Sequence, residues 1–224
     1  MVVNYAARPD AADAVVREIQ AAGGAAQAVQ ADVSDPAAVE RMAQSIGGPV
    51  DVLVNNAGIL RRGDLDEFSA ADFDEMCRIN LGGVIHPTRV FSEGMRQRGY
   101  GRIVNITSVA SVGTAMAGTT FYAATKAAVA LLTRRFALTL GAHGVTVNAI
   151  APGFILTDMV TVGRTGEEIE SATRSIAEKA MMKRVGVPED IANAVSFLVS
   201  EASGFVTAQV LTVDGGRMDY IAHP

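Results

Sequence analysis

Short, mostly apolar segments alternate with amphipathic segments along the chain, and this alternation restricts the possible folds more than any other feature of the sequence. Residues 50–55 and 103–106 are largely apolar at successive positions rather than at every second position. Successive side chains of a strand point to opposite faces, so strands of this kind are buried on both faces. Parallel strands covered by helices on both sides have this character. The sequence therefore predicts an α/β fold.

The order of the segments predicts a doubly wound, Rossmann-type parallel sheet in a single domain spanning residues 1–224. The expected strands cover residues 2–5, 26–32, 50–55, 101–107, 145–150 and 210–213. The expected helices cover residues 9–22, 36–46, 121–140 and 188–200, with one more that starts at Ser69 and continues beyond Asn80. Residues 157–187 are the least regular part and mix acidic with basic side chains. We expect them to form a mobile helical lid.

Composition removes several classes of function. The net charge of −5 gives no basic footprint for nucleic acid. No apolar run approaches the ~20 residues of a membrane span, and the first residues do not resemble a signal peptide. One cysteine, Cys77, predicts no internal disulfide and a cytoplasmic location. The three histidines are scattered without metal-ligand spacing, so no metal site is expected (His86, His143 and His223).

Tyr122 and Lys126 are the first candidates for chemistry. Their i, i+4 spacing within a helical segment places the phenol and the ammonium on one helix face. A phenol has an ordinary pKa of about 10, and a fixed ammonium beside it favours the phenolate. Such a tyrosine can serve as a general acid/base. The alternative is a chance pairing, because a Tyr four residues before a Lys occurs in many helices.

Polar residues follow the expected strands at their carboxyl ends, where open α/β sheets bind ligands. Ser108 ends one strand and can hydrogen-bond a substrate carbonyl, or it can satisfy its own turn. Residues 55–58 (NNAG) end another strand, and the glycine would let a ligand approach the backbone. An Asn-rich turn is the alternative there. Asn80 lies in an apolar helical segment, either exposed or capped, or as a polar anchor of the site.

The order and spacing of these motifs resemble the short-chain dehydrogenase/reductase family, in particular its 3-oxoacyl-carrier-protein-reductase and glucose-dehydrogenase-like branch. The resemblance runs from residue 2 to residue 216. Its landmarks are Asp32 with Val33, the NNAG motif at 55–58, Asn80, Ser108, Tyr122 with Lys126, Pro152-Gly153 with Thr157, RVGVPED at 184–190 and VDGG at 213–216.

The resemblance implies an enzyme that uses NAD or NADP and a small carbonyl or alcohol substrate. Tyr122 would be the general acid/base, Lys126 would lower its pKa and hold the nicotinamide ribose, and Ser108 would orient the carbonyl. Asn80 would support a water-mediated proton relay. The remaining cofactor contacts would come from Asp32 and Val33 along the adenine, Asn55, Ala57 and Gly58 along the cofactor, Pro152 and Gly153 after their strand, and Thr157 near the carboxamide.

The end of the first strand bears on cofactor choice. An Asp there would bind the ribose 2′-hydroxyl and favour NAD. Asn4 and Arg8 instead leave room and positive charge for a 2′-phosphate, so NADP is the expected preference. The alternative is that Arg8 is only a solvated residue at a helix start.

The chain departs from the family pattern at its beginning. Family members begin with a strand and a glycine-rich turn that receives the pyrophosphate. This sequence begins at what would be the second strand, and no glycine-rich turn of that kind follows any strand in it. We therefore expect a sheet opened at its centre, with the N-terminal strand and helix lying upstream of Met1. A genuinely truncated protein with poor cofactor affinity is the alternative.

Two smaller departures concern the substrate. Ser108 and Tyr122 lie one residue further apart than the commonest family spacing, which the small residues of 109–120 could absorb. Leu138 and Thr119 stand where carrier-protein reductases tend to have Arg and often have Gln, which argues against a carrier-protein substrate. The segments around the pocket are small and apolar, which favours a modest, mostly hydrophobic pocket.

Two functions remain open at this level: an oxidoreductase, which the complete set of Tyr122, Lys126, Ser108 and Asn80 favours, and a non-catalytic scaffold or subunit without a cofactor phosphate site. The long helix 121–140 carries apolar residues on more than one face. Together with the resemblance, this predicts a homo-oligomer, a dimer through paired long helices or a tetramer through edge strands near 210–213.

Overall fold

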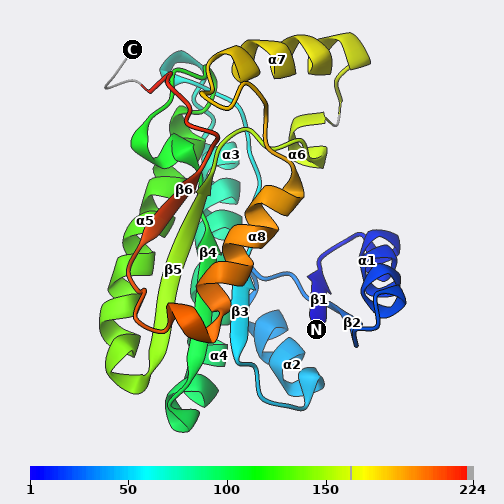
Figure 1. The fold of residues 1–224 in the computed structure, drawn as a ribbon, viewed down its shortest axis with the longest axis vertical. Helices are drawn as coiled ribbons and strands as arrows, with labels where there is room; N and C mark the ends of the chain where they lie inside the picture. The colour runs from blue at the N-terminus through cyan, green and yellow to red at the C-terminus, as the bar shows by residue number, and fades with distance from the viewer. Residues whose placement is uncertain (162, 221–224) are drawn as a thin grey trace.

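The computed structural model describes residues 1–161 and 163–220, so His223 lies outside the described residues. Strands and helices alternate along the chain (Figure 1). The elements are β1 (Val2–Tyr5), α1 (Pro9–Ala21), β2 (Gln27–Gln30), α2 (Pro36–Ile46), β3 (Val52–Asn55), η1 (Leu65–Glu67), α3 (Ala70–Met76), the π-helical turn η2 (Cys77–Leu81), α4 (Gly82–Arg98), β4 (Gly101–Ile106), η3 (Val109–Val112), α5 (Thr120–Leu140), η4 (Gly141–His143), β5 (Val145–Pro152), α6 (Asp158–Thr161), α7 (Gly166–Glu178), α8 (Pro188–Val199), η5 (Glu201–Ser203) and β6 (Val210–Val213).

The strands form parallel sheets covered on both faces, as predicted. β3, β4, β5 and β6 pair in that order, and β1 pairs with β2. Neighbouring residues of β4 pack in different hydrophobic clusters on the two faces of the sheet. Ile103 packs with Met95 of α4 and Ala137 of α5. Val104 packs with Leu198 of α8. Helices α4 and α5 therefore cover one face of the sheet and α8 covers the other, which confirms the doubly wound Rossmann-type arrangement (Figure 1).

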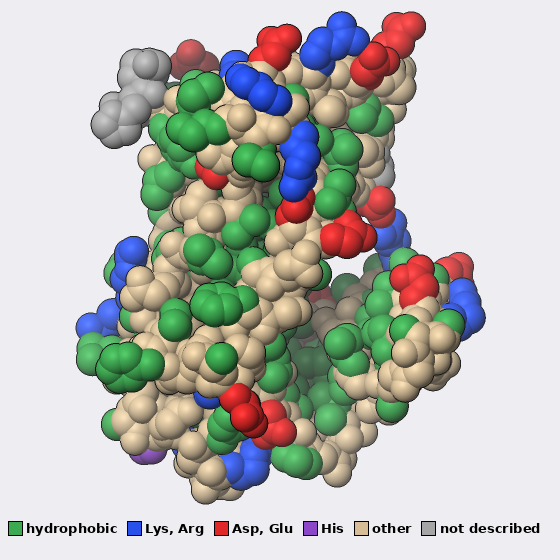
Figure 2. All heavy atoms as spheres, viewed as in Figure 1, with side chains coloured by type: hydrophobic (Ala, Val, Ile, Leu, Met, Phe, Trp, Pro, Cys, Tyr) green, Lys and Arg blue, Asp and Glu red, His purple; other side chains and the backbone are tan. Residues whose placement is uncertain are grey.

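The sheet is interrupted between β1 and β3, as the sequence led us to expect. The two strands do not pair, and a cavity of about 930 Å³ lies between them, lined by Val2 and Asn4 on one side and by β3 on the other. Val52 and Val54 of β3 are 41% and 40% exposed, although a strand this apolar is normally buried. Figure 2 shows the hollow between the N-terminal elements and the rest of the molecule, with hydrophobic side chains around it.

The N-terminal elements are held by α2 rather than by the sheet. Val39 and Met42 of α2 pack with Val90 and Phe91 of α4. Asp35 caps α2 by accepting a hydrogen bond from the Ala37 amide, as its position before Pro36 predicts. The loop after β2 is thereby fixed to the main body even though β1 pairs on one edge only.

The helix expected to start at Ser69 and continue beyond Asn80 is confirmed in extent, and it contains one local feature that was not expected. Ser69 does cap α3, but the π-helical turn Cys77–Leu81 separates α3 from α4. A π-helical turn adds a residue to one helical turn and changes where the side chains point. Here it directs Asn80 into the interior, where its side chain is fully buried. The other expected elements are confirmed with boundaries that differ by a few residues.

Candidate active site

Tyr122 and Lys126 lie one turn apart on the buried face of α5. Their residues are 8% and 4% exposed, and the Lys126 Nζ lies 5.8 Å from the centre of the Tyr122 ring. The Nζ donates a hydrogen bond to the Ile106 carbonyl at 2.9 Å, at the end of β4. The Thr107 hydroxyl donates to the Lys126 carbonyl at 2.6 Å and ties the helix backbone to the same strand end. The predicted pair is therefore a fixed part of the site.

Burial shifts the pKa of both groups in the direction that favours the neutral form. Burial raises the pKa of the Tyr122 phenol, and a hydrogen bond with Ser108 only partly lowers it. Burial lowers the pKa of Lys126 from 10.5 to about 8. The expectation that Lys126 depresses the pKa of Tyr122 is therefore not met in this structure. The cause is desolvation, which acts against the charged form of each group and which spacing along the sequence does not reveal.

Ser108 follows β4. Its hydroxyl was predicted either to satisfy its own turn or to face the site, and both features are present. Its Oγ accepts a hydrogen bond from the Ala110 amide at 3.1 Å and so caps η3. The same side chain lies close enough to the Tyr122 phenol to oppose the rise of its pKa. Ser108 thus satisfies its turn and also lies beside the phenol.

Asn80 is a buried polar anchor rather than an exposed or capping residue. Its Oδ1 accepts from the Ile59 amide at 2.8 Å, and its Nδ2 donates to the Ile59 carbonyl at 3.0 Å and to the Thr125 Oγ1 at 3.0 Å. The π-helical turn therefore ties the chain after the NNAG motif to the catalytic helix. Thr125 was not predicted, although its place one residue before Lys126 could have suggested it.

Asn55 joins neighbouring strands at the floor of the site. Its Nδ2 donates to the Asn105 Oδ1 at 2.8 Å and to the Thr88 Oγ1 at 3.0 Å. Asn105 in turn donates to the Thr133 Oγ1 of α5 at 2.9 Å. The other members of this buried network, Thr88, Asn105 and Thr133, were not predicted. A polar residue inside an apolar strand, as Asn105 is, was the available signal.

Two glycines allow close approaches at the carboxyl edge of the sheet. A Cβ on Gly58 would lie 3.2 Å from both the Asn80 Oδ1 and the Lys126 Nζ. A Cβ on Gly153, just after Pro152 at the end of β5, would lie 2.7 Å from the Asp214 Cα. Thr157 follows on the lid, where its carbonyl accepts the Val160 amide at the start of α6.

The geometry fits the nicotinamide-ribose end of a dinucleotide. An ammonium carries three donors, and Lys126 uses one of them on Ile106 although it is almost fully buried. Ribose hydroxyls are suitable acceptors for the others, and Gly58 leaves room beside them. Among residues 1–161 and 163–220, no glycine-rich turn follows a strand to receive a pyrophosphate, and β1 and β3 face the cavity instead.

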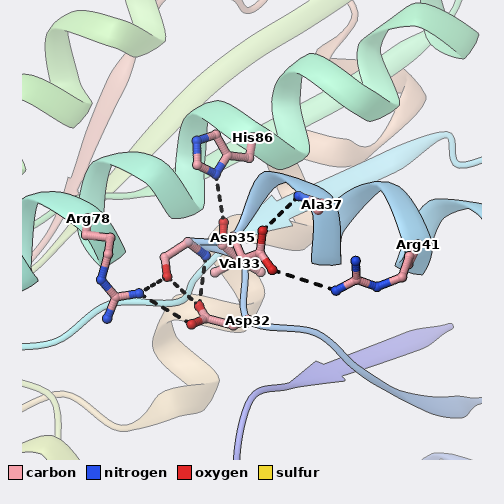
Figure 3. A network of polar contacts seen from close by, with 8 residues as sticks. Asp32, Val33, Asp35, Ala37, Arg41, Arg78 and His86 are labelled. Atoms are coloured by element: carbon pink, nitrogen blue, oxygen red, sulfur yellow. Dashed lines mark hydrogen bonds and ion pairs between the residues drawn. The ribbon is translucent and has the colours of Figure 1, made fainter.

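The adenine-side residues lie on the loop after β2 (Figure 3). The Asp32 Oδ1 accepts hydrogen bonds from the Ser34 amide at 2.9 Å and the Ser34 hydroxyl at 2.6 Å, and Arg78 of the π-helical turn approaches the Asp32 Oδ2 at 3.4 Å. Arg78 also donates to Ser34. These contacts, led by the Ser34 hydroxyl, lower the pKa of Asp32. The Val33 carbonyl lies 3.2 Å from the His86 Nδ1, which places His86 in a structural role.

Asn4 lines the cavity between β1 and β3, and Arg8 follows β1; the two side chains differ in how firmly they are held. Asn4 donates both amide hydrogens to β2, to the Val29 carbonyl at 3.2 Å and the Ala31 carbonyl at 3.0 Å. Arg8 is exposed and pairs with Asp158 of α6 at 2.7 Å. Asn4 is therefore committed to the backbone, whereas Arg8 is in a pair that another anion can replace.

Two other properties of the described residues limit the site. None of their helices has the length and apolar character needed to cross a membrane. They also hold no group of three or more His, Cys, Asp or Glu placed to bind a metal ion.

Comparison with known proteins finds relatives that match nearly the whole chain. The family described as enoyl-(acyl carrier protein) reductase matches residues 1–217. The 3-oxoacyl-[acyl-carrier-protein] reductase of Synechocystis sp. is 41% identical over 222 residues, which cover 97% of this chain and 86% of that protein. Short-chain reductase protein NovJ of Streptomyces niveus is 42% identical over 209 residues, 91% of this chain and 79% of that protein. The crystal structure of a gluconate 5-dehydrogenase from Burkholderia cenocepacia, in complex with NADP and tartrate, has a TM-score of 0.86 at 33% identity and covers 96% of this chain and 83% of its own.

Proposed function

The chain belongs to the short-chain dehydrogenase/reductase family, and we propose that it transfers a hydride between NADP(H) and a small carbonyl or alcohol substrate with Tyr122 as general acid/base. One observation carries this proposal: the almost fully buried Lys126 ammonium has a single acceptor among the described residues and lies near both Gly58 and the Tyr122 ring. A buried ammonium with spare donors is costly unless a ligand uses them.

Each residue contributes orientation or a proton. Bound NADP(H) supplies or accepts the hydride. Ser108 holds the substrate oxygen beside the phenol, and Tyr122 donates a proton to that oxygen in reduction or removes it in oxidation. Lys126 holds the ribose hydroxyls and balances the charge that forms on Tyr122. Asn80 fixes the backbone at Ile59 so that water can connect Lys126 with solvent.

NADP(H) rather than NAD(H) is the preferred cofactor. Arg8 follows β1 at the position where a 2′-phosphate would bind, and no carboxylate stands at the end of that strand to hold a 2′-hydroxyl. The NADP-bound gluconate 5-dehydrogenase supports the same choice. In this proposal the adenine lies along Asp32 and Val33. The middle of the cofactor contacts Asn55, Ala57 and Gly58. The nicotinamide end contacts Pro152, Gly153 and Thr157.

The substrate is a free small molecule rather than a carrier-protein thioester. Leu138 is 72% exposed on α5, so an apolar side chain faces solvent where carrier-protein reductases of the family tend to place an arginine. Thr119 is committed to its own loop through a hydrogen bond to the Met116 carbonyl. Several relatives nevertheless carry carrier-protein names, which makes a carrier-bound substrate the outcome to exclude.

We further propose a cytoplasmic homo-oligomer. The exposed Leu131 and Leu138 continue an apolar stripe along α5 that a second copy can cover, and Phe205 is fully exposed before β6. A single free cysteine fits a reducing compartment.

A catalytically impaired scaffold is the second candidate, and the cavity between β1 and β3 is the observation in its favour. One experiment separates the two. NADPH oxidation is followed with butane-2,3-dione, a free β-keto ester and a carrier-protein-bound β-keto thioester, each with the Tyr122→Phe variant in parallel. Turnover of the free carbonyls that Tyr122→Phe abolishes supports the enzyme. No turnover of any substrate, together with no detectable NADPH binding, supports the scaffold.

A further inference from the structure

The catalytic helix α5 begins without a side-chain cap from its own sequence. Thr119 occupies the N-cap position but makes no side-chain hydrogen bond to the helix. Its hydroxyl donates backwards to the Met116 carbonyl at 2.7 Å. The first amides of a helix lack intrahelical partners and need acceptors from elsewhere. Tyr122 is the third residue of this helix, so any movement of the first turn also moves the phenol.

Asp64, more than fifty residues earlier in the chain, holds the start of α5 in another way, by binding the residues on either side of the N-cap. Its Oδ1 accepts a hydrogen bond from the Thr120 hydroxyl at 2.6 Å, and its Oδ2 accepts from the Gly118 amide at 2.7 Å. The Gly63 amide donates to the Gly118 carbonyl at 3.1 Å. Asp64 thus binds the residues on both sides of the N-cap, and the backbone of Gly63 adds a third hydrogen bond to the same loop.

The loop that Asp64 binds, between Ser108 and Tyr122, needs such support. It connects Ser108 to Tyr122 and is one residue longer than the commonest family spacing. Gly118 adopts a φ of +74°, which a residue with a side chain rarely adopts. Phe121 adds a second anchor, because its ring packs against Phe68 of the segment after Asp64, with centroids 4.7 Å apart. Residues 63–68 therefore form a support on which the first turn of α5 rests.

We propose that Asp64 is a positioning residue for the hydride-transfer reaction: it fixes the first turn of α5 and thereby holds the Tyr122 hydroxyl beside Ser108. Asp64 touches neither substrate nor cofactor in this role and acts only through the helix start. The inference rests on the proposed function of Tyr122.

The test compares Asp64→Asn with Asp64→Glu and with Asp66→Asn, a matched charge change two residues away in the same segment. The Asn side chain is uncharged and has one oxygen acceptor in place of two, so the Thr120 hydroxyl must reverse its role and both charge-assisted hydrogen bonds of the carboxylate are lost. We expect kcat with NADPH and butane-2,3-dione to fall about 10- to 100-fold in Asp64→Asn, as expected for a small misplacement of a catalytic group. The KM for NADPH should stay within about twofold, because Lys126 and the adenine loop are untouched. Asp64→Glu keeps both acceptors and should recover part of kcat, while Asp66→Asn should match the parent protein.

Amide hydrogen exchange gives a readout that does not depend on turnover. Exchange at residues 118–123 should become about fivefold faster in Asp64→Asn, as loss of a helix cap predicts, with no change in α4 or α8. Unchanged exchange at residues 118–123, or a kcat for Asp64→Asn within about twofold of the parent, would overturn the inference. If the parent protein shows no turnover, the proposed function fails, and the exchange experiment alone decides whether Asp64 supports the helix.

Discussion

The Nζ of Lys126 lies 5.8 Å from the centre of the Tyr122 ring, and both side chains are buried in the same wall of the site. Burial raises the pKa of the phenol and lowers that of the ammonium, so each group is driven towards its neutral form. Tyr122 is therefore set to give up its proton only when a ligand or charge at Lys126 compensates for desolvation.

Tyr122→Phe tests the acid/base role. Phenylalanine keeps the ring in its place against Met76 and Ala110 and removes only the hydroxyl that meets Ser108. Turnover should fall by about 100-fold or more, and the free energy of unfolding should change by about 1 kcal/mol, the value of one hydrogen bond. Steady-state kinetics and urea denaturation measure the two effects. Tyr100→Phe, a change of the same kind at the residue that packs under Arg102, should leave kcat intact. A Tyr122→Phe variant with near-normal turnover would contradict the mechanism.

Lys126→Met tests the cost of the buried ammonium. The pKa of Lys126 is about 8 in the folded chain against an ordinary 10.5, so between these pH values the unfolded chain binds more protons and stability rises with pH. From pH 7 to pH 9 the parent protein should gain about 1 kcal/mol relative to Lys126→Met, since one pKa unit corresponds to 1.36 kcal/mol. Below pH 8 the methionine variant should be the more stable of the two, although it has lost turnover.

Urea denaturation of both proteins at several pH values measures this difference. Other titrating groups cancel because they are common to the parent and the variant. A stability difference that stays constant from pH 7 to pH 9 would show that Lys126 remains charged in the folded chain over this range, with its pKa not lowered.

The fold and the pair Tyr122 and Lys126 could be predicted from the sequence because local patterns encode them. Strand β4 is apolar at successive positions, and Tyr122 and Lys126 share a helix face through their spacing alone. The π-helical turn around Asn80 could not be predicted, since the partners that hold its amide lie 21 and 45 residues away. The direction of the Tyr122 pKa was missed for a similar reason. Desolvation depends on how completely the surrounding elements close, and spacing along a helix does not contain that information.

The same limit applies to the polar contacts around the site. Arg78 meets Asp32 across 46 residues, and Asp64 meets Thr120 across 56. Both contacts arise from charged residues that look like ordinary solvated positions in the sequence. They become specific only when the tertiary fold brings the loop after β2 to the π-helical turn and the segment before η1 to the start of α5.

Arg8→Gln tests the cofactor preference. Arg8 pairs with Asp158 on the lid at 2.7 Å, and the 2′-phosphate of NADP(H) would replace that exposed carboxylate. The Kd for NADPH should rise about tenfold, the value of one hydrogen bond to a charged group, while the Kd for NADH stays unchanged. Isothermal titration calorimetry measures both. Arg17→Gln on the exposed side of α1 is the matched control, and Asp158→Asn should tighten NADPH binding because it removes the competing anion. Equal weakening of NADPH and NADH in Arg8→Gln would remove Arg8 from the 2′-phosphate site.

The cavity between β1 and β3 leads to the last prediction. Each of these strands pairs on one edge only, so their other edges present unpaired amides and carbonyls to the cavity. Apolar side chains such as Val52 and Val54 border it and remain partly exposed. A parallel apolar strand entering the cavity would pair with both edges and remove that apolar surface from water. Such a strand needs a crossover of a dozen residues or more before β1, usually a helix.

The 224-residue chain should therefore bind NADP(H) weakly, because nothing orders the region between β1 and β3 where the pyrophosphate would lie. An N-terminal extension of about thirty residues, one apolar strand and one helix joined by a glycine-rich turn, should raise Tm by about 5 °C or more and lower the Kd for NADPH at least tenfold. The matched control carries a proline in the middle of the added strand, which removes a ladder hydrogen bond and should cancel both gains. Calorimetry and thermal melting of the three proteins decide the matter. Tight NADPH binding by the 224-residue chain alone, or equal gains from the proline variant, would mean that the cavity is not a strand site.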